Sequence, residues 1–212
     1  MPTQATPIAA ADAVRTRRAY FDFRHGQLHV RTAFPTTGGF DEEATLFCLH
    51  GLPGSSRLFS RFLPLIAADR SVYAPDLPGN GESDPAPDAS ARSLAAAIAD
   101  LARDLRIKQI DLLAFQAGRP IATELARTDP ALVRRLILVG GGDRLPLSDL
   151  TQPSLVIQIG AGQGDRDSDR AASIDGAGNA VFVHASEFAE DLFEAAPQTL
   201  ATRFAAFLNA PS

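Results

Sequence analysis

Short apolar runs alternate with segments of helical periodicity along most of the chain, and this alternation is the strongest constraint on its fold. The apolar runs are predicted to be strands buried on both faces, and they cover residues 44–49, 71–74, 109–115, 132–139, 154–159 and 180–184. Apolar residues at helical spacing lie between them: Leu94, Ile98, Leu101 and Leu105 after the candidate N-cap Ser90, and also Leu58, Phe62 and Leu65. Strands that alternate with helices predict an α/β fold with a mainly parallel, doubly wound sheet.

The N-terminal part of the chain departs from this alternation. Residues 18–26 and 27–35 alternate apolar with polar side chains and are joined at His25-Gly26, which predicts an antiparallel hairpin at a sheet edge. Residues 1–14 lack a basic segment before an apolar stretch, so we expect a flexible tail without a secretory signal, and a cytoplasmic protein. Residues 15–212 are long enough to form a single domain with a full core.

Charge and cysteine content argue against several classes of function. The formal net charge of -5, from 20 basic and 25 acidic residues, disfavours binding to nucleic acid or to anionic membranes. No run approaches the roughly 18 consecutive apolar residues of a membrane-spanning helix. The single cysteine, Cys48, precludes an internal disulfide and a multi-cysteine metal site, and its apolar neighbours predict a buried side chain. We therefore expect no metal and no cofactor.

The segment around Gln116 has the pattern of a tight turn between a strand and a helix. An apolar run ends at Phe115, small residues stand at Ala114 and Gly118, and an amphipathic segment follows. Small residues on both sides of a central side chain are what a nucleophile elbow requires, because strand and helix approach closely there. The central residue is nevertheless a glutamine, whose carboxamide nitrogen is not a useful nucleophile.

Two further motifs resemble those of the α/β-hydrolase family. The turn His50-Gly51-Leu52-Pro53-Gly54-Ser55 is similar to the family's HGxPGS turn, and residues 76–84 are similar to its DLPGxGxSD loop. The likeness runs from about Arg18 onward. It implies a sheet of the α/β-hydrolase type, and the short interval between Val139 and Ser154 leaves no room for the helical lid, so we expect no cap domain.

The resemblance assigns a place to each residue of the family's catalytic triad. Gln116 stands at the nucleophile position, Asp165 or Asp167 at the acid position, and Glu187 at the histidine position. Two of the three triad residues are therefore missing. His184 lies three residues earlier, on the strand itself, so its side chain would have to bend around the end of the strand to reach residue 116. The backbone amides of Leu52 and Ala117 correspond to the family's oxyanion hole.

The other polar residues of these motifs have structural interpretations. We expect His50 to hold its turn in place, with a role as a base as the minor alternative. Asp76 and Asp84 are expected to tie loops through hydrogen bonds to backbone, and Ser55 or Ser56 to cap a helix. His25 and His29 lie in the hairpin and are predicted to be surface residues. Glu187 has two interpretations, a solvated loop acid and a general base with a raised pKa. The aspartates from 165 to 169 lack the glycine and the closing glutamate of a calcium loop.

Three hypotheses about function follow from these residues. The first is a protein without serine-dependent hydrolase activity that binds a small molecule or a protein partner at the crevice above the sheet. The second is an enzyme with altered chemistry, a hydrolase, lyase or isomerase, in which Glu187 or Asp165 is the base and the amides of Leu52 and Ala117 stabilise an oxyanion. The third is an assembly partner of an active paralogue. Apolar surface left by the missing lid would suit such an interface or a homodimer.

Overall fold

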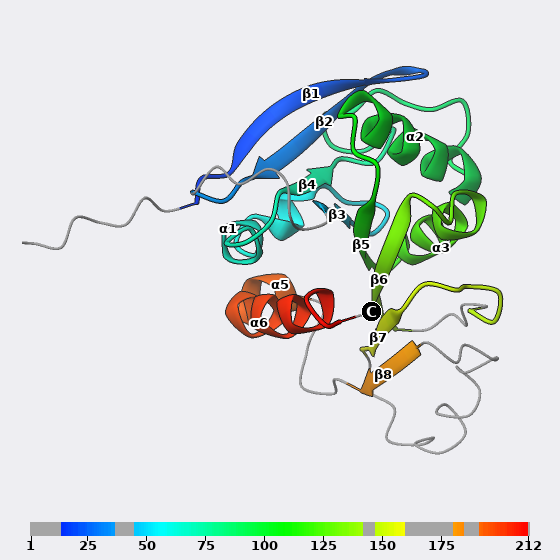
Figure 1. Cartoon of the computed structure of the whole chain (residues 1–212). Coiled ribbons are helices and arrows are strands. Elements are labelled where there is room, and N and C mark those ends of the chain that lie inside the picture. The colour runs from blue at the N-terminus through cyan, green and yellow to red at the C-terminus, as the bar shows by residue number, and fades with distance from the viewer. Residues whose placement is uncertain (1–13, 37–44, 142–146, 160–179, 185–190, 212) are drawn as a thin grey trace, which may run out of the picture.

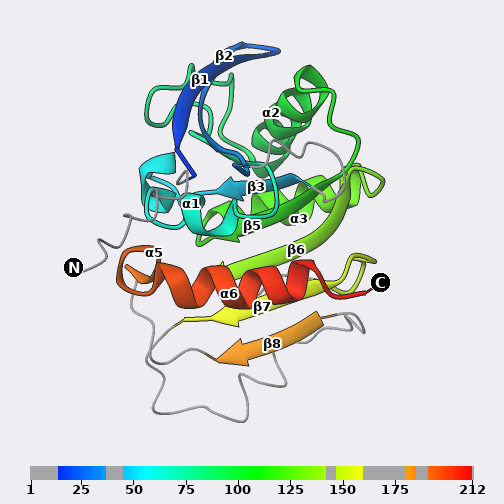
Figure 2. The ribbon, with the colours of Figure 1, turned by 60° about the vertical axis from the view of Figure 1, so that its left-hand side comes forward.

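The computed structural model describes residues 14–36, 45–141, 147–159, 180–184 and 191–211. For residues 182–184 it describes the backbone alone. Within these ranges the chain forms one sheet of eight strands in the order β1-β2-β4-β3-β5-β6-β7-β8 (Figure 1; Figure 2). The strands are β1 (Arg17–Phe23), β2 (Gly26–Ala33), β3 (Thr45–Leu49), β4 (Val72–Pro75), β5 (Ile110–Phe115), β6 (Val133–Gly140), β7 (Ser154–Gln158) and β8 (Ala180–His184).

The pairing of the strands confirms the predicted fold class. Strands β1 and β2 form an antiparallel hairpin, and β2 pairs antiparallel with β4. From β4 through β3, β5, β6 and β7 to β8, every neighbouring pair is parallel. The connection from Gly140 to Ser154 has no room for a lid of several dozen residues.

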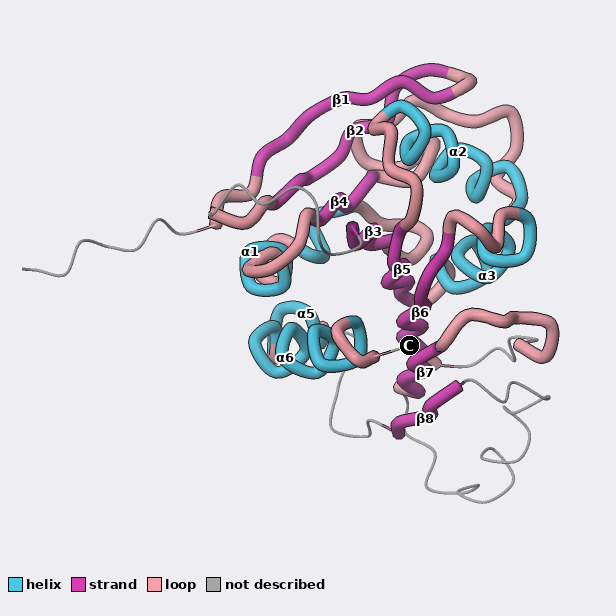
Figure 3. The backbone as a smooth tube through the Cα atoms, in the orientation of Figure 1, coloured by secondary structure: helices cyan, strands magenta, loops and turns pink. Residues whose placement is uncertain are grey.

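Helices cover both faces of the sheet, as Figure 3 shows. They are the 3-10 helix η1 (Ser56–Phe59), α1 (Leu63–Ile66), α2 (Ala91–Asp104), α3 (Gly118–Thr128), α5 (Leu192–Ala195) and α6 (Pro197–Leu208). Helices α2 and α3 lie on one face, and α1, α5 and α6 on the other (Figure 1). None of the helices in the described ranges is long and apolar enough to cross a membrane.

One predicted helix is divided into two short ones. The spacing of Leu58, Phe62 and Leu65 predicted a single helix, whereas the structure has η1 and then α1. Pro64 lies in the first turn of α1 and has no backbone N–H, and its ring would clash with a carbonyl one turn earlier in a continuous helix. The prediction was therefore wrong about the continuity of this helix.

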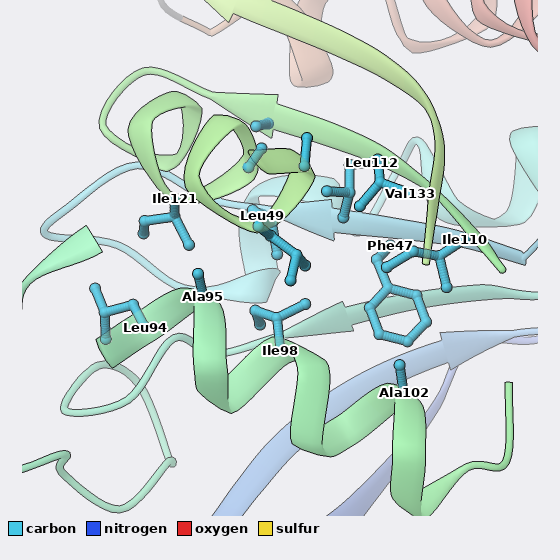
Figure 4. Packing of buried hydrophobic residues seen from close by; sticks show 14 of the residues in the cluster. Phe47, Leu49, Leu94, Ala95, Ile98, Ala102, Ile110, Leu112, Ile121 and Val133 are labelled. Carbon is cyan, nitrogen blue, oxygen red and sulfur yellow. The ribbon is translucent and has the colours of Figure 1, made fainter. Parts of the chain in front are cut away.

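Alternation along the central strands creates a core on each face of the sheet. Phe47, Leu49 and Leu112 face α2 and α3, where they meet Leu94 and Ile98 of α2 (Figure 4). The intervening residues of the same strands, Cys48 among them, face α1, α5 and α6. Cys48 has no exposed surface, as predicted. Fully burying a large apolar side chain contributes roughly 1.5–3 kcal/mol, so these two layers supply most of the stabilisation of the sheet.

An aromatic cluster attaches the C-terminal helices to the strand that precedes Gln116. The ring of Phe193 in α5 meets those of Phe59, Phe62 and Phe115 at centroid distances of 4.9, 5.3 and 5.6 Å. All three pairs have the edge-to-face arrangement that aromatic quadrupoles favour. Because Phe115 is the last residue of β5, this cluster fixes the strand end from which the turn at Gln116 starts.

The turn of the hairpin is bound to α2 through Asp100. The carboxylate of Asp100 accepts hydrogen bonds from Arg24 Nε at 2.7 Å and Arg103 Nη1 at 2.5 Å. Burial alone would raise the pKa of Asp100, but these arginine hydrogen bonds outweigh it and lower the pKa from 3.8 to about 2.

This carboxylate is expected to make folding stability depend on acid pH. Its pKa is lower in the folded state, so its contribution is fully present above pH 3.8 and is lost as the pH falls towards 2. The contribution is about 1 kcal/mol, because the Arg24 and Arg103 side chains are 50% and 70% exposed and their charges are screened. Urea unfolding at several pH values should show a shallower acid dependence for Asp100→Asn than for the wild type. Equal slopes for the two proteins would contradict this assignment.

Candidate functional site

Gln116 occupies a tight turn between β5 and α3 with a left-handed backbone. Its φ is 49°, a region that costs a residue with a side chain about 1–2 kcal/mol. The Gln116 N–H donates to the carbonyl of Val139 at 2.8 Å, and the Arg119 N–H donates to the carbonyl of Gln116 at 3.0 Å. The backbone is thus that of the elbow that the sequence predicted, with a carboxamide at its tip.

Small residues allow this turn to form. A Cβ on Gly118 would lie 2.8 Å from the carbonyl oxygen of His50 and 2.9 Å from that of Leu49, which is closer than real Cβ atoms come to backbone. A Cβ on Gly51 would lie 3.2 Å from the Cβ of Gln116. The start of α3 therefore lies directly against the end of β3 and the turn that follows it, so the predicted need for a small residue at 118 is confirmed.

Arg119 ties the turn to the end of β6, and the sequence reasoning missed this residue. Its side chain is buried, and it donates from Nε to the carbonyl of Gln116 at 3.2 Å and from Nη2 to the carbonyl of Gly141 at 2.8 Å. A Cβ on Gly140 would lie 3.0 Å from Oε1 of Gln116. The carboxamide therefore lies beside the strand end that Arg119 holds. The sequence signal that could have identified Arg119 was its position, a charged residue three places after the central residue of the predicted elbow.

The amides of Leu52 and Ala117 have no partner among the described residues. Neither N–H donates a hydrogen bond there, although most backbone donors in folded proteins are paired. A Cβ on Gly51, which precedes Leu52, would lie 3.8 Å from the Ala117 nitrogen, so the turn after β3 adjoins the turn at Gln116. Ala117 is exposed and Leu52 half-buried. This arrangement leaves two backbone donors next to Gln116 for the oxygen of a ligand.

His50 has both ring nitrogens engaged in structural hydrogen bonds. Its side chain is fully buried, Nε2 accepts from the Leu77 N–H at 2.9 Å, and Nδ1 lies 2.6 Å from the carbonyl oxygen of Gly51. Since Nε2 accepts, Nδ1 must carry the proton and donate. Burial lowers the pKa of His50 and keeps the ring neutral. The imidazole holds the turn, as predicted, and neither nitrogen is free to act as a base.

The loop after β4 is organised around the carboxylate of Asp76. Oδ1 accepts from the Ser56 N–H at 2.6 Å and Oδ2 from the Glu82 N–H at 3.0 Å. Burial alone would raise the pKa of Asp76, but hydrogen bonds from Ser56 and Glu82 outweigh it, so the pKa lies below its ordinary value. Asp84 likewise accepts from the Gln27 N–H at 2.9 Å. The predicted tying of loops to backbone is confirmed for both aspartates.

The prediction that His29 is a surface residue was wrong. Its exposure is 1%, and Nδ1 lies 2.9 Å from Oδ2 of Asp76. The sheet edge is β1, whereas β2 pairs on both sides, and the loop after β4 covers this side chain: the His29 N–H donates to Ser83 Oγ at 2.9 Å. His25, in contrast, is exposed as expected. Ser55 caps η1 by accepting from the Arg57 N–H, also as predicted.

The remaining candidates cannot be placed at this site. Asp165, Asp167 and Glu187 lie outside the described residues, and so does the side chain of His184, whose Cα pairs with Gln158 at the end of β8. In the part of the chain that the structure describes, no cluster of three or more His, Cys, Asp or Glu side chains could hold a metal ion. The structure thus brings together Gln116, Leu52 and Ala117.

Comparison with known protein families gives one match over most of the chain. Residues 44–207 match the family described as alpha/beta hydrolase fold. Among solved structures, an alpha/beta hydrolase fold protein from Chitinophaga pinensis superposes with a TM-score of 0.78 over 95% of this chain and 100% of that one, at 12% identity. At that identity the likeness concerns the fold alone.

Two curated relatives are similar to parts of this sequence. An uncharacterized hydrolase from Saccharomyces cerevisiae is 32% identical over 99 residues, which is 46% of this chain and 34% of the relative. The 2-hydroxy-6-oxononadienedioate/2-hydroxy-6-oxononatrienedioate hydrolase of Cupriavidus pinatubonensis is 30% identical over 162 residues, which is 74% of this chain and 55% of the relative. The chain therefore spans about a third to a half of the length of these relatives.

Proposed function

Because the chain belongs to the alpha/beta hydrolase fold family, we propose that it uses that family's site for binding instead of serine-dependent hydrolysis. It takes a small molecule or a protein partner at the carboxyl end of the strands, beside Gln116. Ligands of open α/β sheets bind at this end because the loops that follow the strands converge there.

The observation that carries this proposal is the elbow itself. A strained, left-handed backbone is kept at Gln116, and two unpaired amides adjoin it at Leu52 and Ala117. Strain of this kind persists where the surrounding structure holds it, and it clusters at functional sites. The carboxamide adds one donor group and one acceptor but cannot form an acyl bond.

The chemistry of the donors indicates the kind of group that is bound. Two adjacent backbone N–H groups without partners suit an oxygen with negative character, such as a carbonyl or carboxylate oxygen. The relative from Cupriavidus pinatubonensis is named for a dioate substrate with an oxo group, which carries such oxygens. A small molecule with a carbonyl or carboxylate group is therefore the favoured ligand.

Restoring the missing catalytic groups is the direct test of this site. The wild type is expected to release no more product from an activated ester than a Gln116→Ala variant, because neither has a nucleophile at the elbow. The double variant Gln116→Ser with Glu187→His should gain weak esterase activity if the amides of Leu52 and Ala117 serve as an oxyanion hole. Gln116→Ala with Glu187→His is the matched control, and circular dichroism verifies that each variant is folded.

Each other result has a definite meaning. A burst of product from the wild type, or a covalent adduct with an organophosphonate, would refute the proposal. Wild-type turnover that is lost in Glu187→Gln or Asp165→Asn would support an enzyme with altered chemistry. A folded double variant without activity would contradict the positions assigned to Gln116 and Glu187.

A further inference from the structure

A cavity of about 330 Å³ lies apart from the Gln116 turn. His29 and Arg31 of β2, Ser55 and Arg57 at the start of η1, and Asp76 and Glu82 of the loop after β4 line it. Gln116 and Leu52 are not among its lining residues. Its volume lies within the range of about 300–1,000 Å³ that is usual for small-molecule sites.

Two guanidinium groups in this cavity make no ion pair or hydrogen bond with another described residue. They belong to Arg31 and Arg57, and Nε of Arg31 is buried without a partner. A buried donor left unsatisfied costs about 1–3 kcal/mol, and more when the group is charged. Arginine matches the geometry of phosphate and carboxylate oxygens, so an oxyanion would satisfy the buried donor of Arg31 and could also pair with Arg57, which is exposed to solvent.

His29 adds an unpartnered acceptor to this wall. The side chain is 1% exposed, and Nδ1 lies 2.9 Å from Oδ2 of Asp76. An ionised carboxylate only accepts hydrogen bonds, so Nδ1 carries a proton and donates it to Asp76. Nε2 has no partner, and in the neutral form of the ring it presents a lone pair. A ligand that satisfies His29 therefore brings an O–H group as well as anionic oxygens.

The oxygens of the two carboxylates at the cavity already accept hydrogen bonds from the protein. Asp76 already accepts from the N–H groups of Ser56 and Glu82 and from His29. The carboxylate of Glu82 accepts from the hydroxyl of Tyr20 at 2.9 Å in an exposed position, where solvent and salt screen its charge. The unpaired donors and the acceptor of this cavity are thus left for the ligand.

We propose that this cavity binds the phosphate group of a small phosphorylated molecule. Arg31 and Arg57 hold the charged oxygens, and the remaining P–O–H group donates to Nε2 of His29. Hydrogen phosphate combines these two features, whereas sulfate has no O–H at neutral pH. This site is additional to the binding site beside Gln116 and does not depend on the function proposed there.

The experiment is a titration of the full chain, labelled with nitrogen-15, with inorganic phosphate at constant ionic strength. Saturable shifts are expected for the amides of Gly54, Ser55 and Gly81, and Arg31→Gln with Arg57→Gln should raise the Kd at least tenfold. Arg92→Gln, an exposed arginine of α2, is the matched control and should leave the Kd unchanged. Shifts that do not saturate, or an equal Kd in the double variant, would overturn the proposal.

Two further arms test the role of His29. Sulfate should bind the wild type several-fold more weakly than phosphate, because it lacks the hydroxyl donor. His29→Asn keeps an amide donor for Asp76 and removes Nε2, so it should abolish the preference for phosphate over sulfate. Equal binding of the two anions by the wild type would refute this role. If His29→Asn fails to fold, that wild-type preference and the arginine variants decide the outcome.

Discussion

Replacing Asp111 by alanine is expected to lower the free energy of unfolding by about 3–5 kcal/mol. Asp111 lies in β5 with no exposed surface, and Arg134 donates to it from Nε at 2.9 Å and from Nη2 at 2.6 Å. Arg70, also buried, has Nη1 3.7 Å from the same carboxylate. Without Asp111 the partly buried Arg134 would lose its carboxylate partner, and the buried Arg70 would keep only Asp69 as a carboxylate partner. Removing one partner of a buried ion pair is the costly way to break it.

The destabilisation caused by Asp111→Ala should extend to the C-terminal helix, α6. Nη2 of Arg134 also donates to the carbonyl of Leu208 at 3.1 Å, and Arg135 donates to the carbonyls of Phe207 and Leu208. Cations at the end of a helix satisfy its last carbonyls and interact favourably with its dipole. Asp111 thus orients Arg134, one of the two arginines that hold the end of α6 against the sheet.

Urea denaturation measures this loss, and the chain offers a matched control. Asp149 pairs with Arg127 at 2.6 Å, but its side chain is 56% exposed. Asp149→Ala should therefore cost less than about 1 kcal/mol. Similar losses for the two variants would show that the buried cluster around Asp111 is not a special determinant of stability.

The second large effect is expected for Gly118→Ala. In an ordinary helix this substitution would stabilise by up to about 1 kcal/mol, because alanine has the higher helix propensity. Here the new methyl group would meet the carbonyl oxygens of His50 and Leu49, which belong to backbone and cannot move aside cheaply. The variant is therefore expected to lose about 1–3 kcal/mol of stability.

Gly118→Ala should also move the turn at Gln116 away from Leu52 and weaken ligand binding there. Glu124→Ala, in the same helix and only partly buried, is the control and should change stability by less than about 0.5 kcal/mol. Thermal unfolding and the amide shifts of Gly51 and Leu52 report the two effects. A stabilised Gly118→Ala variant would contradict the close approach of α3 to β3.

The strands and the turn were predictable because their signals are local. Apolar runs at 109–115 and 154–159 became β5 and β7 to within a residue or two, and Ser90 caps α2 by accepting from the Ser93 N–H. The turn at Gln116 was predictable from the small residues Ala114 and Gly118, because the close packing of strand and helix there is also local. The family match over residues 44–207 agrees with the resemblance of the two loop motifs.

The errors concern contacts between distant segments. His29 is a polar residue in a segment where apolar and polar side chains alternate, which predicts exposure. It is buried only because the loop after β4 covers it. In the sequence, Arg119 has the pattern of an ordinary residue on a helix surface. Only the structure shows that the end of β6 lies beside it. The cavity at Arg31 and Arg57 likewise combines residues from three segments, which no pattern within one segment indicates.

The buried imidazole of His50 couples two regions of the surface. It joins the turn after β3 to the loop after β4, because one ring nitrogen bonds to Gly51 and the other to Leu77. The first segment supplies the Leu52 amide beside Gln116, and both segments contribute walls to the cavity at Arg31. If a ligand at one location displaced this imidazole and thereby altered affinity at the other, thermodynamic linkage would require the reverse influence to have equal size.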